Sequence, residues 1–228
     1  MKKRICALLL AALMIVVIQN TDHVMITEMV GKEENGYYSA AITSAVVVQF
    51  VFIAIIDSFR PLILSTKKEN QIEYEKNMSR LYGIVCYLAI AQSLAFTIFA
   101  PLIIGVLYGE QYAAAIPILQ VLTWQCSFSY MGMIRNIWLL AEEKQKYLPL
   151  INLSGVIANI VLNAVLIPFW GAFGAAFASF FTQFSMNFLF GFILKPVRQN
   201  NRLLLKGLNP RFFAGEVKLI VKELLKKG

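Results

Sequence analysis

Ionisable residues are scarce in this sequence, and their scarcity excludes an ordinary soluble domain. Only 15% of the 228 residues are Asp, Glu, Lys or Arg, whereas soluble domains carry about 25%. Hydrophobic residues make up 58%, and the mean hydropathy is +0.65. A chain of this composition belongs to the membrane class.

The residue sets of common metal, redox and hydrolytic sites are also missing. The sequence has one histidine, and its three cysteines, Cys6, Cys86 and Cys126, lie inside apolar runs without metal-ligand spacing. It contains no GxxxxGK[ST], GxSxG or HExxH motif. We therefore expect a protein that is not an enzyme and that holds no cofactor and no metal ion.

The net charge of +8 does not indicate a nucleic-acid partner. The 21 Lys and Arg residues lie between apolar runs and near the C-terminus, and no basic patch is interleaved with aromatic residues. We interpret the charge as information on membrane topology, because Lys and Arg concentrate in cytoplasmic loops.

Six long apolar runs predict an all-α fold, a polytopic membrane helix bundle of six transmembrane helices. The predicted spans, which together form a transmembrane lobe over residues 1–195, are about 5–30, 37–64, 81–107, 112–140, 147–167 and 171–194. If both termini are cytoplasmic, 18 of the 21 basic residues lie on the cytoplasmic side and only Lys32 lies outside. This asymmetry predicts a multi-pass protein with both termini in the cytoplasm.

Residues 196–228 have a different pattern, that of a basic cytoplasmic tail. Apolar residues such as Phe213 and Leu224 share one side of a helical projection, and Lys218, Lys222 and Lys226 share another. This pattern predicts a C-terminal amphipathic helix lying on anionic membrane lipid. The alternative is a solvated and partly frayed tail.

Residues 152–179 combine an amide stripe with a small-residue face. Asn152, Asn159 and Asn163 lie within a narrow sector of one helix. After the turn Pro168-Phe169-Trp170-Gly171, small residues recur at a spacing of four, which lets a neighbouring helix approach closely in lipid. Both features favour a packed membrane bundle.

This stretch resembles the fifth-to-sixth helix signature of the polysaccharide (oligosaccharide) flippase family, which belongs to the multidrug, oligosaccharidyl-lipid and polysaccharide exporter superfamily. Two further stretches support the resemblance. Residues 35–41, NGYYSAA, are similar to the family's GxYxxA helix start, and residues 107–115, LYGEQYAAA, are similar to its LYGxxYxxA turn. Family members usually have two six-helix lobes, and this chain resembles only the C-terminal lobe.

The resemblance implies a function in surface polysaccharide biosynthesis. The chain would be half of a flippase that moves a polyprenyl-pyrophosphate-linked oligosaccharide across a bacterial inner membrane by alternating access. Its partners would be membrane lipid and either a separate N-terminal lobe or a second copy of itself. Two alternatives remain: a multidrug-extrusion cation antiporter, and a non-transporting fragment or scaffold of a polysaccharide assembly complex.

Arginines within the predicted spans are candidates for substrate binding. Arg60 and Arg135 both lie toward the cytoplasmic side of their spans, where a guanidinium could bind phosphate. The alternative for Arg60 is a pair with Asp57, three residues earlier on the same helix.

Other polar residues in the spans suggest a coupling site and a cavity wall. We name Asp22, His23 and Asp57 as candidates for binding a coupling ion, because intramembrane carboxylates often do so. Asn159 and Asn163 are candidates for lining a substrate cavity. The alternative for these amides is hydrogen bonding that holds helices together.

Overall fold

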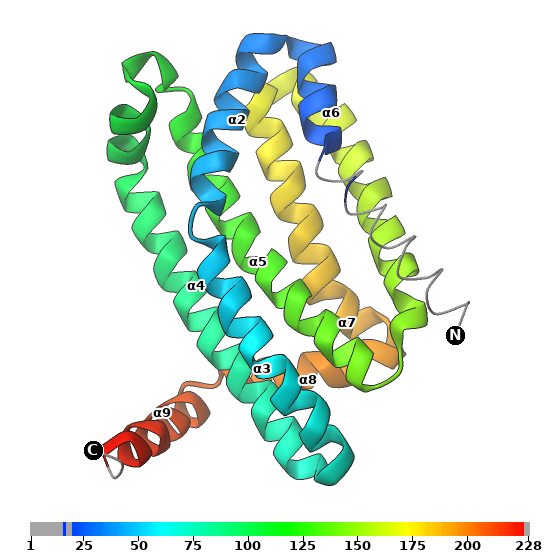
Figure 1. The fold of residues 1–228 in the computed structure, drawn as a ribbon. Coiled ribbons are helices and arrows are strands. Elements are labelled where there is room, and N and C mark those ends of the chain that lie inside the picture. The colour runs from blue at the N-terminus through cyan, green and yellow to red at the C-terminus, as the bar shows by residue number, and fades with distance from the viewer. Residues whose placement is uncertain (1–15, 17–19, 226–228) are drawn as a thin grey trace.

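The structure is a computed structural model that describes residue 16 and residues 20–225 of the chain. Every regular element in this part is a helix (Figure 1), which confirms the predicted all-α membrane helix bundle. Three helical runs are long and apolar enough to cross a membrane: Gln49–Glu69, Gln71–Tyr108 and Gln145–Ile193. The count of six spans stays a prediction, and most of the first predicted span lies outside the described residues.

The second predicted span, 37–64, corresponds to two helices with a short break between them. Residues 20–30 form a helix, and after Gly31 the chain continues in α2 (Lys32–Val46) and α3 (Gln49–Glu69). Gly31 has φ 103°, a left-handed conformation that glycine adopts without strain. Gln49, the first residue of α3 after the break at residues 47–48, lines a cavity between the helices.

α4 (Gln71–Tyr108) begins ten residues before the predicted span at 81, so the stretch between the predicted spans, residues 65–80, is almost entirely helical. Asn70 alone separates α4 from α3. The Asn70 side-chain oxygen accepts hydrogen bonds from the backbone N–H groups of Ile72 at 3.0 Å and Glu73 at 3.2 Å. This is a standard N-cap, which satisfies donors that the first helical turn leaves free.

α5 (Ala115–Ala141) lies at the centre of the bundle, between α4, α2, α3 and α6 (Figure 1). Its buried side is rich in large residues, including Tyr130 and Trp138, which are 1% and 0% exposed. Tyr130 stacks on Phe52 of α3 with 4.1 Å between ring centroids. The helix thus supplies core residues and also residues that line a polar cavity, with Tyr130 belonging to both.

α6 (Leu148–Phe184) reverses direction at Gly171, whose φ and ψ are 55° and −139°. Its second half returns alongside α5 (Figure 1). The carboxylate of Glu34 accepts a hydrogen bond from the N–H of Ala172 at 2.8 Å, where the second half begins. The turn expected from residues 168–171 is therefore a tight hairpin whose new helix start is satisfied by a side chain of α2.

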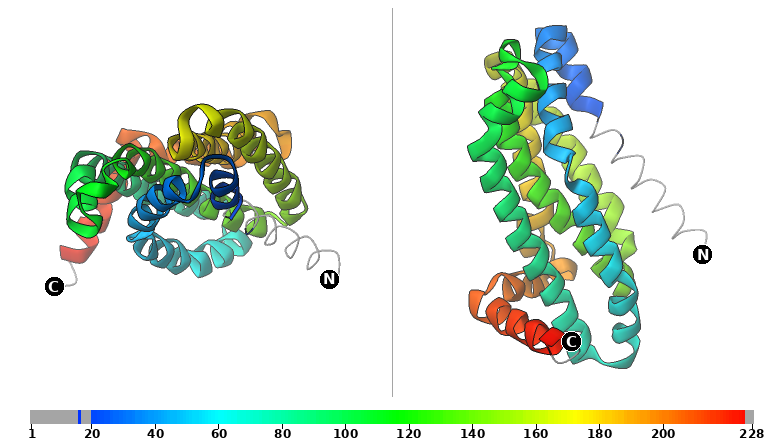
Figure 2. Two further views of the ribbon diagram at one scale, coloured as in Figure 1. Left: turned by 90° about the horizontal axis from the view of Figure 1, so that it is seen from above. Right: turned by 60° about the vertical axis from the view of Figure 1, so that its left-hand side comes forward.

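The chain after α6 forms a compact structure at the opposite end of the bundle. A π-helical turn, η3 (Ser185–Leu189), is followed by α7 (Phe190–Ile193), a short 3-10 turn η4 (Lys195–Val197) and α8 (Arg198–Leu208). α8 runs crosswise to the long helices, and α9 (Pro210–Leu225) leads away from them (Figures 1 and 2). We call the two ends of the bundle the Gly171 end and the α8 end.

α8 was not anticipated from the sequence, which predicted one helix in residues 196–228. The Tyr82 hydroxyl donates to the side-chain oxygen of Asn200 at 2.7 Å, and the Tyr87 hydroxyl donates to the carbonyl of Leu208 at 2.9 Å. Gly207 packs directly on the backbone of α4 near Ser79. Residues 198–208 therefore belong to the packed bundle rather than to a free tail.

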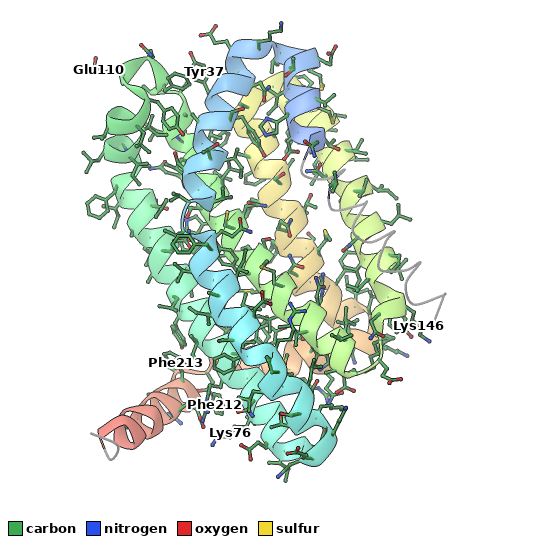
Figure 3. The ribbon with its side chains drawn as sticks, in the orientation of Figure 1. Tyr37, Lys76, Glu110, Lys146, Phe212 and Phe213 are labelled. Atoms are coloured by element: carbon green, nitrogen blue, oxygen red, sulfur yellow. The ribbon has the colours of Figure 1, made fainter. Side chains whose placement is uncertain are left out.

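The start of α9 is anchored to α4 by charge and by an aromatic contact. Phe213 stacks on Tyr87 with 4.3 Å between ring centroids, and Figure 3 shows it beside the ribbon of α4. Arg80 donates from Nε to the Glu216 carboxylate at 2.8 Å, and Lys76 Nζ lies 3.4 Å from the other carboxylate oxygen. Burial opposes ionisation of Glu216, but its bonds to Arg80 and Lys76 outweigh burial and lower its pKa.

We expect Gly171→Ala to destabilise the bundle, because a Cβ at positive φ costs about 1–2 kcal/mol and would lie 2.5 Å from a Glu34 oxygen. Gly36→Ala is the matched control: Gly36 lies inside α2 with nothing within 4 Å of an added Cβ. The control should be neutral or slightly stabilising. Thermal unfolding of both purified variants in detergent measures the difference, and equal melting temperatures would contradict it.

We expect the docking of α9 to weaken in acid. A carboxyl group whose pKa is lower when docked stabilises docking above the ordinary glutamate pKa of about 4.3. That stabilisation is lost as the pH falls through the lowered pKa of Glu216. Hydrogen exchange of residues 210–216 should therefore accelerate in acid relative to the core. Glu216→Gln should exchange faster at neutral pH and lose this acid response; an unchanged response would refute the role of Glu216.

Candidate functional site

A polar cavity lies between α2, α3, α5 and α6. It consists of two adjacent pockets of about 330 and 230 Å³, both of which are lined by Gln49, Ser129 and Gln183. These shared residues lie where the two pockets meet. The larger pocket has Asp22 and His23 in its wall, and the smaller has Arg135.

Asp22 is buried, with 4% of its surface exposed, and its carboxylate is held entirely by neutral donors. One oxygen accepts from the side-chain amides of Asn159 at 3.1 Å and Asn163 at 2.6 Å. The other accepts from the hydroxyls of Tyr38, at 2.6 Å, and Ser179. No Lys or Arg within residues 20–225 forms an ion pair with it.

Two further polar groups lie beside this carboxylate. The side-chain oxygen of Asn163 is buried and has no hydrogen-bond partner among the described residues. His23 Nδ1 lies 2.7 Å from the Asn35 side-chain oxygen, and its ring packs edge-on against Tyr38. The Asp22 end of the cavity is therefore negative and rich in oxygen atoms.

Arg135, at the other end, is a buried guanidinium without a counter-charge. It is 4% exposed. Its Nη1 donates to the carbonyl of Met186 at 2.8 Å and to the side-chain oxygen of Asn187 at 2.7 Å, and its Nη2 donates to Asn136 at 3.3 Å. Its Nε is buried without a partner, and no carboxylate in the described part of the chain pairs with it. Burying an uncompensated charge costs several kcal/mol, so an anion in the adjoining pocket would be strongly favoured.

The π-helical turn η3 positions the partners of Arg135. A π turn is wider than an α turn and departs from the usual backbone hydrogen-bond ladder, so it can present a carbonyl to a side chain. Met186 and Asn187 both belong to this turn. Gly132 of α5 makes room for it, because a Cβ there would lie 2.6 Å from the Asn187 side-chain oxygen.

α8 also contacts the π turn. The side-chain amide of Asn201 donates to the carbonyl of Phe188 at 2.7 Å. Side chains from two separate helices, α5 and α8, thus bind carbonyls in one five-residue turn. The geometry around Arg135 therefore depends on α8 as well as on the cavity itself.

A family model described as "Polysaccharide biosynthesis protein" matches residues 5–117, about half of the chain. The chain belongs to this family. No curated protein and no solved structure matches it.

Membership agrees with the resemblance to polysaccharide flippases drawn from the motifs, and it assigns the chain a role in polysaccharide biosynthesis or export. In this polysaccharide biosynthesis protein, the matched part contains Asp22, Tyr38 and Gln49 of the cavity. Arg135 and the hairpin at Gly171 lie beyond it.

The structure groups the predicted site residues differently from the sequence. Asn159 and Asn163, candidates for a substrate cavity, are fully buried and bind Asp22, a candidate for ion coupling. Neither asparagine lines either pocket. His23 does line the larger pocket, next to Asp22, and Arg135 lines the smaller one.

Arg60 and Asp57 are not brought to this cavity. They form the i, i+3 pair foreseen as the alternative, at 2.7 Å, with side chains 48% and 52% exposed. Neither lines the two pockets. Their roles in substrate binding and ion coupling stay predictions.

Several cavity residues were not identified from the sequence. Tyr38 and Ser179 bind Asp22, while Gln183 and Asn187 line the Arg135 pocket. Gln183 and Asn187 are four residues apart in an aromatic run, and Asn187 donates to Gln183 at 2.7 Å. Amides at that spacing in an otherwise apolar helix were a usable signal for a polar face.

We expect Asp22→Ala to destabilise the bundle by about 3 kcal/mol, because it leaves buried donors without an acceptor. Asp22→Asn keeps one side-chain oxygen and should cost less. Glu28→Ala serves as the control, since Glu28 is exposed on the same helix. Thermal unfolding in detergent should rank the variants in this order, and an Asp22→Ala protein as stable as the control would disprove the interpretation.

Proposed function

We propose that this chain is one lobe of a flippase for lipid-linked oligosaccharides in a bacterial inner membrane. Its substrate is a polyprenyl-pyrophosphate-linked oligosaccharide, it works by alternating access, and both termini and the α8 end face the cytoplasm. The observation that carries the proposal is Arg135, a buried guanidinium without a counter-charge beside a polar pocket.

The Arg135 pocket has the chemistry of a phosphate-sugar headgroup site. Guanidinium donors bind phosphate oxygens at two points, and the Nε of Arg135 is still free. The other polar side chains of the pocket are neutral amides and one hydroxyl, which suit sugar hydroxyl groups: Gln49, Ser129, Asn136, Asn152, Gln183 and Asn187. A pocket with one cation and no carboxylate favours an anionic, hydroxyl-rich ligand.

The size of the cavity supports the need for a second lobe. Ligand sites commonly enclose about 300–1,000 Å³, and the two pockets here measure about 330 and 230 Å³. They can accept the part of the headgroup nearest the phosphates, but not an extended oligosaccharide. In the proposed transporter the remainder lies against a separate N-terminal lobe or a second copy of this chain.

Asp22 is the proposed coupling site. A buried carboxylate without a cationic partner can take up a proton or a monovalent cation. The nearby oxygen of Asn163, which has no partner among the described residues, adds a ligand for either. Proton or cation binding at Asp22 and phosphate binding at Arg135 then occur in adjacent pockets that share Gln49, Ser129 and Gln183.

A multidrug-extrusion antiporter is the second candidate, favoured by the larger pocket. Asp22, Tyr38 and Tyr130 together line it, and a carboxylate with aromatic rings suits an organic cation. This candidate leaves the Arg135 pocket without a role. Dye efflux measured beside polysaccharide export distinguishes the two candidates.

The decisive variant is Asn187→Asp, which places a carboxylate where Arg135 already binds an oxygen. The new ion pair should keep the protein at least as stable as wild type while competing with a phosphate ligand. We expect export to fall about tenfold or more in cells that need the flippase for surface polysaccharide, with the N-terminal lobe supplied. Asn187→Ala, which removes the same side-chain hydrogen bonds without adding a charge, is the control and should lose less export than Asn187→Asp.

Arg135→Gln completes the test, because it removes the charge and retains hydrogen-bonding groups. It should abolish export at normal protein level in the membrane. Wild-type export by either Asn187→Asp or Arg135→Gln, at normal protein level, would rule out the headgroup role of Arg135.

A further inference from the structure

One side of α8 carries a row of basic residues that the cavity does not use. Arg198, Arg202 and Lys206 are spaced four residues apart and are exposed, and we call them the α8 basic row. The opposite side of the helix, with Asn200, Leu203, Leu204 and Gly207, is buried against the bundle. None of the three basic residues forms an ion pair within the described part of the chain.

No acidic residue on α8 itself balances the basic row. Glu75 of α4 accepts a hydrogen bond from the Gln199 side chain of α8 at 3.3 Å, but it forms no ion pair with the three basic residues. Residues 195–211 contain five basic residues and no Asp or Glu. Arg198 donates to the carbonyl of Phe192 at 3.2 Å, and Lys206 lies over the ring of Phe212 at 5.4 Å. Arg202 has no such contact with the residues that the structure describes. An uncompensated row of this kind is complementary to an anionic partner.

Exposed apolar residues beside the row indicate which anionic partner it fits. Ile193 at the end of α7 is 70% exposed, and Leu205 on α8 itself is 45% exposed. Phe212 and Phe213 lie close by, where α9 begins (Figure 3). Basic and apolar side chains that are exposed together on a helix crosswise to membrane spans are typical of the boundary between headgroups and hydrocarbon.

We propose that the α8 basic row is a docking surface for anionic lipid headgroups. Basic clusters that directly follow a membrane span attract the anionic lipids of the cytoplasmic leaflet, and the row begins five residues after Ile193. This inference depends on the proposed function in one respect only, the assignment of the α8 end to the cytoplasmic side. An acidic protein is less suitable as the occupant, because it would leave Ile193 and Leu205 uncovered.

Lipid bound at this surface would affect the geometry of the cavity through one hydrogen bond. Asn201, on the buried side of α8, holds the carbonyl of Phe188 in the π turn. The same turn supplies Met186 and Asn187, the partners of Arg135. A headgroup that fixes α8 therefore also fixes the turn that positions Arg135.

The experiment compares two double variants of the full chain. Arg202→Gln with Lys206→Gln removes two charges from the row; Arg198 is left because it also bonds to the backbone. Lys68→Gln with Lys146→Gln removes two exposed charges elsewhere, and Lys146 lies at the same end of the bundle (Figure 3). The detergent-solubilised proteins are titrated with phosphatidylglycerol or phosphatidylcholine, and thermal unfolding is followed.

Phosphatidylglycerol should stabilise the wild type and the Lys68/Lys146 control, and phosphatidylcholine should not. Each basic residue near an anionic surface contributes about fivefold in affinity, so the Arg202/Lys206 variant should bind phosphatidylglycerol about thirtyfold more weakly. Because no polysaccharide substrate is used, the result does not depend on whether the chain is a flippase.

Four results would overturn the docking surface. The first is full stabilisation of the Arg202/Lys206 variant by phosphatidylglycerol, and the second is an equal loss in the control. The third is the same stabilisation by inorganic phosphate, which would indicate a simple anion site. The fourth is a larger stabilisation by polyglutamate that the Arg202/Lys206 variant loses, which would indicate an acidic protein.

Hydrogen exchange tests the connection to the cavity. Phosphatidylglycerol should slow exchange of residues 185–189 in the wild type, but not in the Arg202/Lys206 variant. Asn201→Ala should bind the lipid as the wild type does and show no slowing there. Equal slowing of exchange in Asn201→Ala would refute the connection through Asn201. If Asn201→Ala folds poorly, the Arg202/Lys206 variant, whose changes are at exposed positions, still shows whether exchange of residues 185–189 depends on lipid at the basic row.

Discussion

Each polar side chain buried in this bundle has to find its hydrogen bonds within the protein, because lipid offers none. Asp22 meets this requirement with four neutral donors that come from α2 and from both halves of α6. Arg135 meets it only in part, because its Nε has no partner within the described residues. The contrast is between the Asp22 carboxylate, whose two oxygens are both bonded within the protein, and the Arg135 guanidinium, which keeps an unpaired donor.

The hairpin at Gly171 makes the satisfied end possible. It folds the two halves of α6 against each other, so that Asn159 of the first half donates to Ser179 of the second at 3.2 Å. Both then bind Asp22. In the sequence, the amide stripe and the small-residue face of residues 152–179 look like two independent packing features. In the structure, both contribute donors that bind the Asp22 carboxylate.

Much of the helical framework could be predicted from the sequence, because apolar runs of membrane length have few alternative structures. The site was harder to predict. Arg60 and Arg135 look alike in the sequence, because each is a lone arginine in an apolar run. The one local difference is Asp57, an acidic residue one helical turn before Arg60. The deciding contacts of Arg135 come from residues 51 and 52 positions later. They depend on a π turn, which no local pattern reveals.

α8 was missed for a related reason. Its sequence, RQNNRLLLKGL, is polar and resembles a solvated tail. Asn200 and Asn201 are buried only because Tyr82 and the π turn offer them partners far away in the chain. Buried asparagines of this kind cannot be told from exposed ones by composition, since the difference lies in tertiary contacts.

The second half of α6 and the π turn that follows join the two ends of the cavity. Ser179, Gln183 and Asn187 follow one another at a spacing of four residues, with Ser179 on Asp22 and Asn187 on Arg135. Gln183 is shared by both pockets and accepts from Asn187. In the proposed cycle, an ion that takes Asp22 competes with Ser179, and a phosphate that takes Arg135 competes with Asn187. The ion and the phosphate therefore both act on one rigid element, the second half of α6 with its π turn. A shared element of this kind is the physical requirement for coupling the binding of one ligand to that of the other.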